Sequence, residues 1–332
     1  MMKRRAASIV AATGLILTFV VAPSAASAAQ SSSHGSSGAR ATAAKGSRAL
    51  SAPLPPPKTV RPFQSTALPG EGVWRSAGRP VGAQSAIYTT TVRLPGSSNV
   101  RAGIAWMDVK LLNARLYSGS LSPGGLNWKY TAPISASASR TLVAAFSGGY
   151  LMKDSRGGYF SEGRLVAPLR VGGASLVIYR DGFATVGQWG RDVTMTPNVV
   201  AVRQNLTLLV ENGRPVAGLN PADTSVWGVS LHRVVNTPRS GIGVTANGAL
   251  VYVEGPMNIV DLADILVRAG AVRAMTLDMN PFWPVFATFS PSTINGLASP
   301  ANGRDLLATM YQQPGRFYEA AYNRDFITMS AK

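Results

Sequence analysis

The chain predicts an α+β fold in which a mixed, hairpin-rich β-sheet is flanked by a few helices. Runs rich in β-branched and apolar residues outnumber helical patterns. Tight-turn dipeptides join several of these runs directly, as in antiparallel hairpins. One amphipathic helix lies between two strand-like runs, which indicates a β-α-β unit around residues 241–278.

Four strand-like runs occupy the first half of the predicted domain. The first of them is β-branched and alternates apolar with polar side chains, which is typical of a half-buried strand. The last is a short, almost wholly apolar run. Their ranges are 86–94, 100–109, 111–117 and 141–146.

Three hairpins are indicated by turn dipeptides. Asn-Gly and Asp-Gly accept the positive φ angles of two-residue turns, so the signal is fairly specific. Residues 181–182 join 175–180 to 183–186, residues 212–213 close 206–210 onto 215–216, and residues 247–248 join 241–244 to 249–254. The strands are therefore expected to pair locally.

One helix is well defined by the sequence. Asn258 is expected to cap it, and Asp261 lies three residues further on, where a capping box places an acid. Gly270 provides the usual C-terminal stop. A second helix is expected over residues 304–311. The apolar stripe of the first helix consists of Leu262, Ile265, Leu266 and Ala269.

The first 28 residues have the pattern of an export signal. Lys3, Arg4 and Arg5 form a basic start, residues 9–22 are apolar, and residues 26–28 form a small-residue cleavage site. The apolar stretch is shorter than the roughly 20 residues that span a bilayer. This predicts a secreted, extracellular protein that could associate with the cell wall. The alternative is an uncleaved membrane anchor.

Residues 29–70 are predicted to form a disordered spacer ahead of a domain over residues 71–332. The spacer is rich in Ser, Ala, Gly and Pro, contains five basic residues and contains no acid. Such a composition buries too little apolar surface to offset the loss of chain entropy. The spacer is either a passive export linker or a tail that binds a polymer.

The net charge narrows the classes of partner. Loss of the three basic residues of the signal lowers it from +17 to +14, and the five in the spacer leave +9 for the domain. This charge attracts anionic envelope polymers or acidic substrates. Nucleic acid is not expected, because the basic residues are scattered and no nucleic-acid-binding motif occurs. Stable membrane insertion is not expected either.

The residue types present limit the chemistry. The chain has no cysteine and 2 histidines. This excludes thiol catalysis, disulfides and zinc sites built on thiolates or several imidazoles. A Ser-His-Asp triad would depend on His232, and no Gly-x-Ser-x-Gly elbow is present. No metal or cofactor is predicted, so the chemistry must depend on the 15 carboxylates.

Asp278 is the best placed of these carboxylates. It ends an apolar strand over residues 273–278, which follows the helix. Ligands bind at the carboxyl ends of strands in such units. A carboxylate that closes an apolar strand is costly unless it is paired or functional. Arg239 begins the strand expected beside it and could hold a phosphate through two hydrogen bonds, or form a surface salt bridge.

Two further segments carry candidate binding groups. Ser147, Gly148 and Gly149 follow an apolar strand, and free amides in such a turn can bind an anion. An ordinary glycine turn is the alternative. The charged, glycine-rich loop over residues 153–164, which contains Lys153 and Glu162, is either a binding loop or a solvated run of charges.

Residues 144–289 resemble the phosphodiester glycosidase domain family, the uncovering-enzyme-like glycosidases, in its exported actinobacterial branch. The family has a strand that ends in Asn-Gly-Gly-Phe, which corresponds to residues 147–150, and a strand that begins with Arg-x-x-x-Gly, which corresponds to residues 239–243. Its helix corresponds to residues 260–269, and its strand that ends in Leu-Asp corresponds to residues 277–278. Two positions depart from the family pattern. Ser147 replaces an asparagine, and Met279-Asn280-Pro281 replaces the Gly-Gly-Gly-Ser run that follows the family's aspartate.

The resemblance implies hydrolysis of a sugar-1-phosphodiester, such as a cell-envelope glycosyl phosphate, to a free sugar and a phosphomonoester. It implies that Asp278 is a base or electrostatic stabiliser and that Glu162 is a second carboxylate. The substrate- and phosphate-binding residues that it implies are Arg239, Ser147, Gly148, Gly149, Asn280 and Lys153. The alternative is a non-catalytic envelope glycopolymer-binding protein on the same fold.

Overall fold

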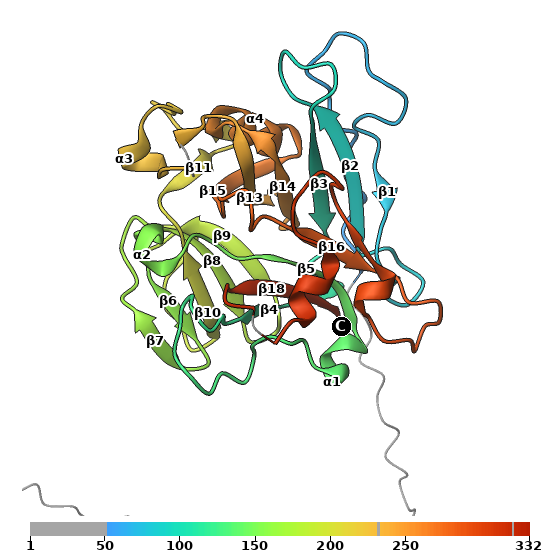
Figure 1. Cartoon of the computed structure of the whole chain (residues 1–332), viewed down its shortest axis with the longest axis vertical. Coiled ribbons are helices and arrows are strands. Elements are labelled where there is room, and N and C mark those ends of the chain that lie inside the picture. The colour runs from blue at the N-terminus through green and yellow to red at the C-terminus, as the bar shows by residue number, and fades with distance from the viewer. Residues whose placement is uncertain (1–51, 231–232, 321) are drawn as a thin grey trace, which may run out of the picture. The chain divides into compact units, whose positions relative to one another are not determined.

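The structure is a computed structural model. It describes residues 52–332 except 231, 232 and 321, all of them in the part of the chain that follows Arg48 (Figure 1). Regular structure there is mostly β-sheet, with few helices, in agreement with the coarse α+β prediction. The helices are α1 (Ala136–Ser139), α2 (Met152–Ser155), α3 (Thr224–Trp227) and α4 (Ile259–Arg268), with 3-10 turns η2 (Pro300–Asn302) and η3 (Pro314–Tyr318).

The largest sheet has eight strands in the order β1-β2-β3-β14-β13-β15-β11-β12. Each neighbouring pair runs antiparallel. The strands are β1 (Arg75–Ser76), β2 (Ile87–Arg93), β3 (Arg101–Met107), β11 (Leu208–Glu211), β12 (Arg214–Pro215), β13 (Thr237–Thr245), β14 (Leu250–Met257) and β15 (Ala271–Thr276).

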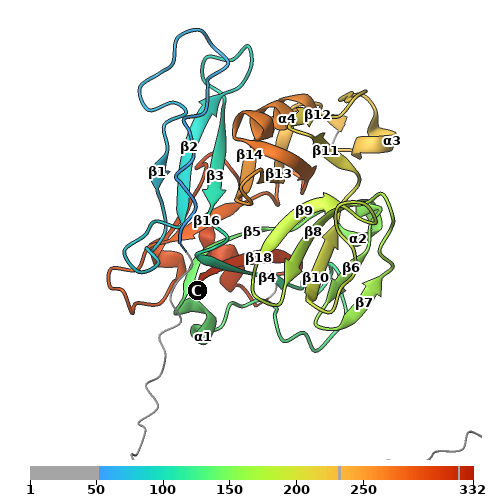
Figure 2. The ribbon, with the colours of Figure 1, turned by 180° about the vertical axis from the view of Figure 1, so that it is seen from behind.

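Two five-stranded antiparallel sheets complete the fold, as the front and back views in Figures 1 and 2 show. One has the order β7-β6-β10-β8-β9, with β6 (Tyr159–Ser161), β7 (Arg164–Ala167), β8 (Ala174–Tyr179), β9 (Ala184–Gln188) and β10 (Val199–Gln204). The other has the order β17-β16-β5-β18-β4, with β4 (Leu112–Tyr117), β5 (Leu142–Ser147), β16 (Phe286–Phe289), β17 (Gly303–Asp305) and β18 (Phe326–Ala331).

The three hairpins predicted from turn dipeptides are confirmed. They pair β8 with β9, β11 with β12 and β13 with β14. Gly182, Gly213 and Gly248 have φ angles of 81°, 70° and 91°, the left-handed region that such turns require. Local turn chemistry was therefore sufficient to predict these pairings.

The predicted helix is α4, and its caps are as expected. The Asn258 side chain accepts hydrogen bonds from the amides of Val260 and Asp261, both at 2.9 Å. Gly270 follows the helix with a φ of 95°. The helix joins β14 to β15, which run parallel to each other because each is antiparallel to β13 between them. The β-α-β unit is thus present with one strand inserted.

The second predicted helix, over residues 304–311, is wrong. Residues 303–305 instead form β17, in which Asp305 pairs with Ala287 of β16. Leu306 then packs against the bare backbone of Gly103, where an added Cβ would lie 2.7 Å from its side chain. Sheet pairing and this apolar contact override the weak local helical pattern.

The predicted disordered spacer is wrong for residues 52–70. Leu54 and Val60 are buried, with 7% and 0% of their surface exposed, in the core under α4. The Leu54 amide donates to Asp108 at 2.7 Å, and the Val60 amide donates to the Gly72 carbonyl at 3.0 Å. Phe63 packs against the same cluster, and the Gln64 side chain donates to the carbonyls of Leu94 and Ser97, so apolar packing and long-range hydrogen bonds hold this segment. The rest of the spacer, the signal sequence and His232 lie outside the described residues.

The sheets share one large core. Phe146 of β5 contacts Tyr252 of β14 and Phe286 of β16, with ring centroids 5.2 Å and 5.8 Å apart, and Leu176 of β8 belongs to the same cluster. This packing brings the end of β15 next to the end of β5 and the start of β18. Among the described residues, none of the helices is both long enough and apolar enough to cross a bilayer.

Candidate active site

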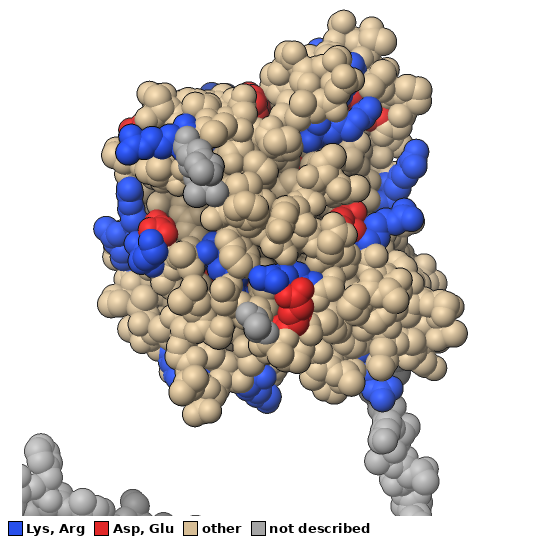
Figure 3. All heavy atoms as spheres, in the orientation of Figure 1, with Lys and Arg blue, Asp and Glu red and all other residues tan. Residues whose placement is uncertain are grey.

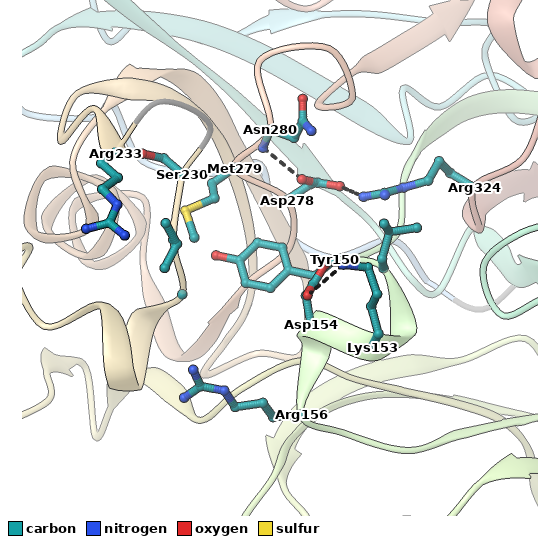
Figure 4. Close-up of a pocket in the computed structure, with 13 residues that line it drawn as sticks. Tyr150, Lys153, Asp154, Arg156, Ser230, Arg233, Asp278, Met279, Asn280 and Arg324 are labelled. Carbon is teal, nitrogen blue, oxygen red and sulfur yellow. Dashed lines mark hydrogen bonds and ion pairs between the residues drawn. The ribbon is translucent and has the colours of Figure 1, made fainter.

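A cavity of about 660 Å³ lies where the end of β15 meets the segments that follow β5 and precede β18 (Figure 4). Another part of its wall, ahead of β13, is formed by Gly228, Val229, Ser230 and Arg233. Four of the lining residues are basic and two are acidic, so the cavity is positively charged. The charged lining residues are Lys153, Arg156, Arg233, Arg324, Asp154 and Asp278.

Asp278 is held in this cavity by the sheet. The amide of Ser240 in β13 donates to the Asp278 carbonyl at 2.7 Å, and the Leu277 amide donates to the Ser240 carbonyl at 2.8 Å. The pairing of β13 with β15 thus continues to the carboxylate itself. The Asn280 amide donates to Asp278 Oδ1 at 2.9 Å. Asn280 therefore orients Asp278 as expected, but through its backbone.

The other carboxylate oxygen of Asp278 forms an ion pair with Arg324, which sequence reasoning missed. Figure 4 shows Asp278 between Asn280 and Arg324. Asp278 is 2% exposed, and burial raises its pKa, while the Arg324 charge acts in the opposite direction. The Arg324 guanidinium also lies 5.0 Å from the centre of the Trp283 ring. Arg324 thereby makes a buried carboxylate tolerable at this position.

A second buried ion pair lies behind the cavity wall. Arg203 Nε donates to Asp325 Oδ2 at 2.8 Å, and both side chains are at most 1% exposed. Gly148 and Gly149 make room for this pair, because an added Cβ would lie 2.0 Å from Asp325 and 2.9 Å from Arg203. The Gly148 amide donates to the Asp325 carbonyl at 2.9 Å.

Neither Gly148 nor Gly149 lines the cavity, so the structure does not bring these two predicted phosphate-binding residues to it. Their small size serves the Arg203–Asp325 pair. Ser147 does not reach the cavity either. It is 3% exposed, and its hydroxyl donates to the Trp283 carbonyl, which ties β5 to the segment that follows Asp278.

Arg239 lies on the strand beside β15, as predicted, but its side chain points elsewhere than into the cavity. Nε donates to the Met257 carbonyl at 2.8 Å, Nη2 to the Val235 carbonyl at 3.3 Å, and Nη1 contacts Met279 Sδ at 3.4 Å. Burial lowers its pKa. Arg239 supports the wall from behind, so the structure does not bring this predicted phosphate ligand to the cavity.

Glu162 is not a second carboxylate of this site. It lies in the tight turn between β6 and β7, with a φ of 52°. Its carboxylate accepts hydrogen bonds from the amides of Lys129 at 2.9 Å and Tyr130 at 2.8 Å. The acid fixes a neighbouring loop, a long-range contact that its position in the sequence does not reveal.

Of the predicted binding residues, Lys153 and Asn280 do line the cavity. Lys153 is exposed and lies 3.4 Å from Asp154, which also lines it. Arg156, in the same charged loop, and Arg233 were not chosen as site residues. Arg156 could have been found, since the loop was already recognised as polar and glycine-rich.

Tyr150 forms part of the cavity floor. Its ring packs with Met279 and Leu206, and its hydroxyl donates to the Trp227 carbonyl at 3.2 Å. Burial raises its pKa, so it is a neutral hydrogen-bond donor at physiological pH. No group of three or more His, Cys, Asp or Glu side chains suited to a metal ion occurs within the described part of the chain.

Comparison with known proteins gives a family match for part of the chain. Residues 140–278 match the family model described as phosphodiester glycosidase. The comparison with curated proteins found no match.

Two solved structures are similar at low identity. The zebrafish N-acetylglucosamine-1-phosphodiester alpha-N-acetylglucosaminidase catalytic domain, auto-inhibited by its pro-peptide, is 15% identical, with a TM-score of 0.46 over 78% of this chain and 88% of that chain. A hypothetical protein from Synechocystis is 11% identical, with a TM-score of 0.40 over 75% and 63%. The resemblance inferred from the sequence is confirmed by the family model: residues 140–278 match the phosphodiester glycosidase family.

Proposed function

We propose that the cavity around Asp278 hydrolyses sugar-1-phosphodiester bonds. The observation that carries the proposal is a buried carboxylate in the wall of a cavity that is otherwise rich in cations. The family match over residues 140–278 supports the same reaction class. The carboxylate can stabilise positive charge on the sugar half of the substrate, and the cations can bind the negatively charged phosphate half.

The phosphate group is assigned to Lys153, Arg156 and Arg233. These residues come from two separate walls of the cavity, and Arg233 lies across Tyr150 from Asp278 in Figure 4. Arginine binds phosphate oxygens through paired N–H groups, and lysine adds a mobile charge. Three cations in one cavity offset the negative charge that grows on the phosphate as the bond breaks.

The reaction needs one well-placed carboxylate. Water attacks the anomeric carbon, the bond from that carbon to the phosphate oxygen breaks, and its electron pair stays on the phosphomonoester. Asp278 stabilises the positive charge that develops on the sugar ring and accepts the proton lost by water. Phosphate is a fair leaving group, so no second carboxylate has to donate a proton. This fits a site without Glu162.

Arg324 is a positioning residue in this scheme. It favours the ionised form of Asp278, against the effect of burial. With the Asn280 amide on the other oxygen, it fixes the plane of the carboxylate. A carboxylate held in this way needs little reorganisation during the reaction.

We further propose that the enzyme acts outside the cell, on glycosyl phosphates of the envelope. The export-signal pattern supports this setting, as does the net charge of +14 that remains once the three basic residues of the signal are removed from +17. Anionic envelope polymers would concentrate a basic protein at its substrate.

A second candidate function is binding of such polymers without catalysis. Asp278 is only 2% exposed and already ion-paired, as a purely structural carboxylate would be. In that case the cations of the cavity bind phosphate and Asp278 only stabilises the wall.

The two functions are separated by Asp278→Asn, with Asp154→Asn as a control for an exposed acid in the same cavity. Turnover of α- or β-linked sugar-1-phosphodiesters should fall on the order of 10²-fold or more in Asp278→Asn, while affinity changes far less. Asp154→Asn should retain most of the activity. A wild-type protein that binds these compounds but releases no sugar from any of them would establish the binding function instead.

A further inference from the structure

A second cavity, of about 510 Å³, lies on the outer face of the sheet at β4 and β18. Its floor is formed by two cross-strand pairs, Arg115 with Thr328 and Asn113 with Ser330. Side chains alternate between faces along a strand, so these four polar side chains share one face. Farther along the same face, Tyr117 and Phe326 are buried and stack at 4.7 Å. The floor is therefore a polar area on a sheet face that is elsewhere apolar.

The wall of this cavity adds mainly hydroxyl groups. It is formed by residues 129–141, which include α1. A hydroxyl both donates and accepts hydrogen bonds, as do the hydroxyls of a sugar, so each can pair with sugar in either direction. The serine and threonine side chains that line the cavity are Thr131, Ser135, Ser137, Thr141, Thr328 and Ser330.

The cavity also carries positive charge that nothing in its lining neutralises. Arg115 and Lys129 line it, and no acid does. Within the described residues, neither of the two side chains forms an ion pair, and the acid nearby, Glu162, pairs with Arg164 at 3.7 Å. This differs from much of the visible face of the protein, where Figure 3 shows scattered basic side chains, several with acidic ones beside them. An anionic ligand would find uncompensated charge here.

Arg115 is preorganised for such a ligand. Its guanidinium lies 4.2 Å from the centre of the Tyr130 ring, which holds the flexible side chain through a cation–π contact. Tyr130 is itself fixed, because its amide donates to Glu162 at 2.8 Å. Glu162, which was expected to be catalytic, thus supports the wall of the second cavity.

We propose that this second cavity binds an anionic carbohydrate, such as a phosphorylated sugar unit of a glycan. Hydroxyls for the sugar and two unpaired cations for the phosphate occur together in it. A neutral sugar would leave the charge of Arg115 unused, and inorganic phosphate would leave the hydroxyl wall unused.

One strand connects the two cavities. Arg324 lines the first cavity just before β18 begins, and Thr328 and Ser330 of the same strand line the second. Six residues of extended chain span about 20 Å. A glycan polymer could therefore occupy both cavities at once, which would retain the substrate through two weak contacts. This last step depends on the proposed function, whereas the binding site does not.

The test is isothermal calorimetry of the full chain with glucose 1-phosphate. Wild type should show two binding events. Arg115→Glu should weaken one of them about tenfold or more, as expected for loss of a charge-assisted contact and its replacement by repulsion. Arg214→Glu makes the same charge change at an exposed position in β12 outside both cavities, and it should leave both events intact. Ser137→Trp, at another exposed position, should block the second cavity by bulk.

Calorimetry with two further compounds identifies the ligand class. Methyl glucoside and inorganic phosphate should each bind the second cavity at least tenfold more weakly than glucose 1-phosphate. Equal binding of inorganic phosphate would overturn the carbohydrate assignment. A single binding event that neither Arg115→Glu nor Ser137→Trp changes would overturn the site.

A hydrolysis assay separates this proposal from the proposed function. Hydrolysis of a small phosphodiester should be the same in Arg115→Glu and wild type. Binding that depends on Arg115 in a protein without hydrolysis would refute the proposed function and leave this site standing.

Discussion

Arg324 and Asp325 are adjacent in the chain, and each belongs to a different buried ion pair. Arg324 pairs with Asp278 in the wall of the first cavity, and Asp325 pairs with Arg203 behind that wall. Arg203 is satisfied by protein alone: Nε and Nη2 donate to Asp325, Nη1 donates to Gln204, and Nη2 also donates to Tyr150. The Nε of Arg324 has no partner among the described residues.

This difference separates a structural pair from a functional one. All three nitrogens of the buried Arg203 guanidinium donate to protein groups, so we infer that the Arg203–Asp325 pair holds the strands together. The Asp278–Arg324 pair is incompletely satisfied and lines a cavity. Burial and ion pairing are common to both. What distinguishes the Asp278–Arg324 pair is that it lines a cavity and that one of its buried donors, Arg324 Nε, has no partner among the described residues.

Arg203→Met should have the largest effect on stability. It leaves Asp325 charged and buried without a cation, which typically costs about 3–5 kcal/mol of the free energy of unfolding. Arg324→Met should cost less, because Asp278 has a raised pKa and can take up a proton instead. Urea unfolding of both variants tests this. Equal losses of unfolding free energy in the two variants would show that the two ion pairs have the same structural role.

Glu254 provides a third case, a buried carboxyl without a cation. It is 0% exposed, accepts a hydrogen bond from the Tyr252 hydroxyl at 3.0 Å, and burial raises its pKa from 4.5 to about 8. The unfolded chain therefore ionises first as the pH rises. The free energy of unfolding should fall between about pH 4.5 and pH 8 and then level off.

Glu254→Gln should remove most of that fall, which amounts to about 1.4 kcal/mol per pH unit within this range. Burial raises the pKa of Asp305 to about 6, so Asp305 also lowers the free energy of unfolding as the pH rises, but at lower pH. This smaller decrease should remain in the variant. Thermal melts at pH 5, 7 and 8.5 give the measurement. A wild-type melting temperature that does not decrease from pH 5 to pH 8.5 would contradict the assignment.

Arg239→Lys should have the smallest effect. Lysine keeps the charge but cannot reach the Met257 and Val235 carbonyls together, so stability should fall by about 1 kcal/mol. Binding of glucose 1-phosphate to the first cavity should be unchanged, because Arg239 lies behind its wall. A tenfold loss of affinity in calorimetry with an intact fold would restore Arg239 as a ligand of phosphate.

Much of the fold could be predicted because its signals are local. The Asp181-Gly182, Asn212-Gly213 and Asn247-Gly248 turns need left-handed backbone, and the strands on either side pair without help from distant residues. The cap of α4 at Asn258 is equally local. Prediction failed at residues 304–311 and 52–70, where a distant surface decides whether a short segment pairs or packs.

The site divides in the same way. Asp278, Asn280 and Lys153 were predicted and do line the cavity: Asp278 and Asn280 follow a strand with a clear local pattern, and Lys153 lies in the charged, glycine-rich segment recognised in the sequence. Arg324 was missed because nothing near it in the sequence reveals that its partner lies 46 residues away.

The sequence by itself determined the three hairpins, the capped helix α4 and the position of a carboxylate at the end of a strand. Only the tertiary structure decided which charges meet. It placed Arg324 against Asp278, gave Glu162 to two backbone amides, and reserved the space of Gly148 and Gly149 for a buried ion pair. The physical reason is that turns and caps depend on backbone angles within a few residues, whereas pairing of buried charges depends on which strands the core brings together.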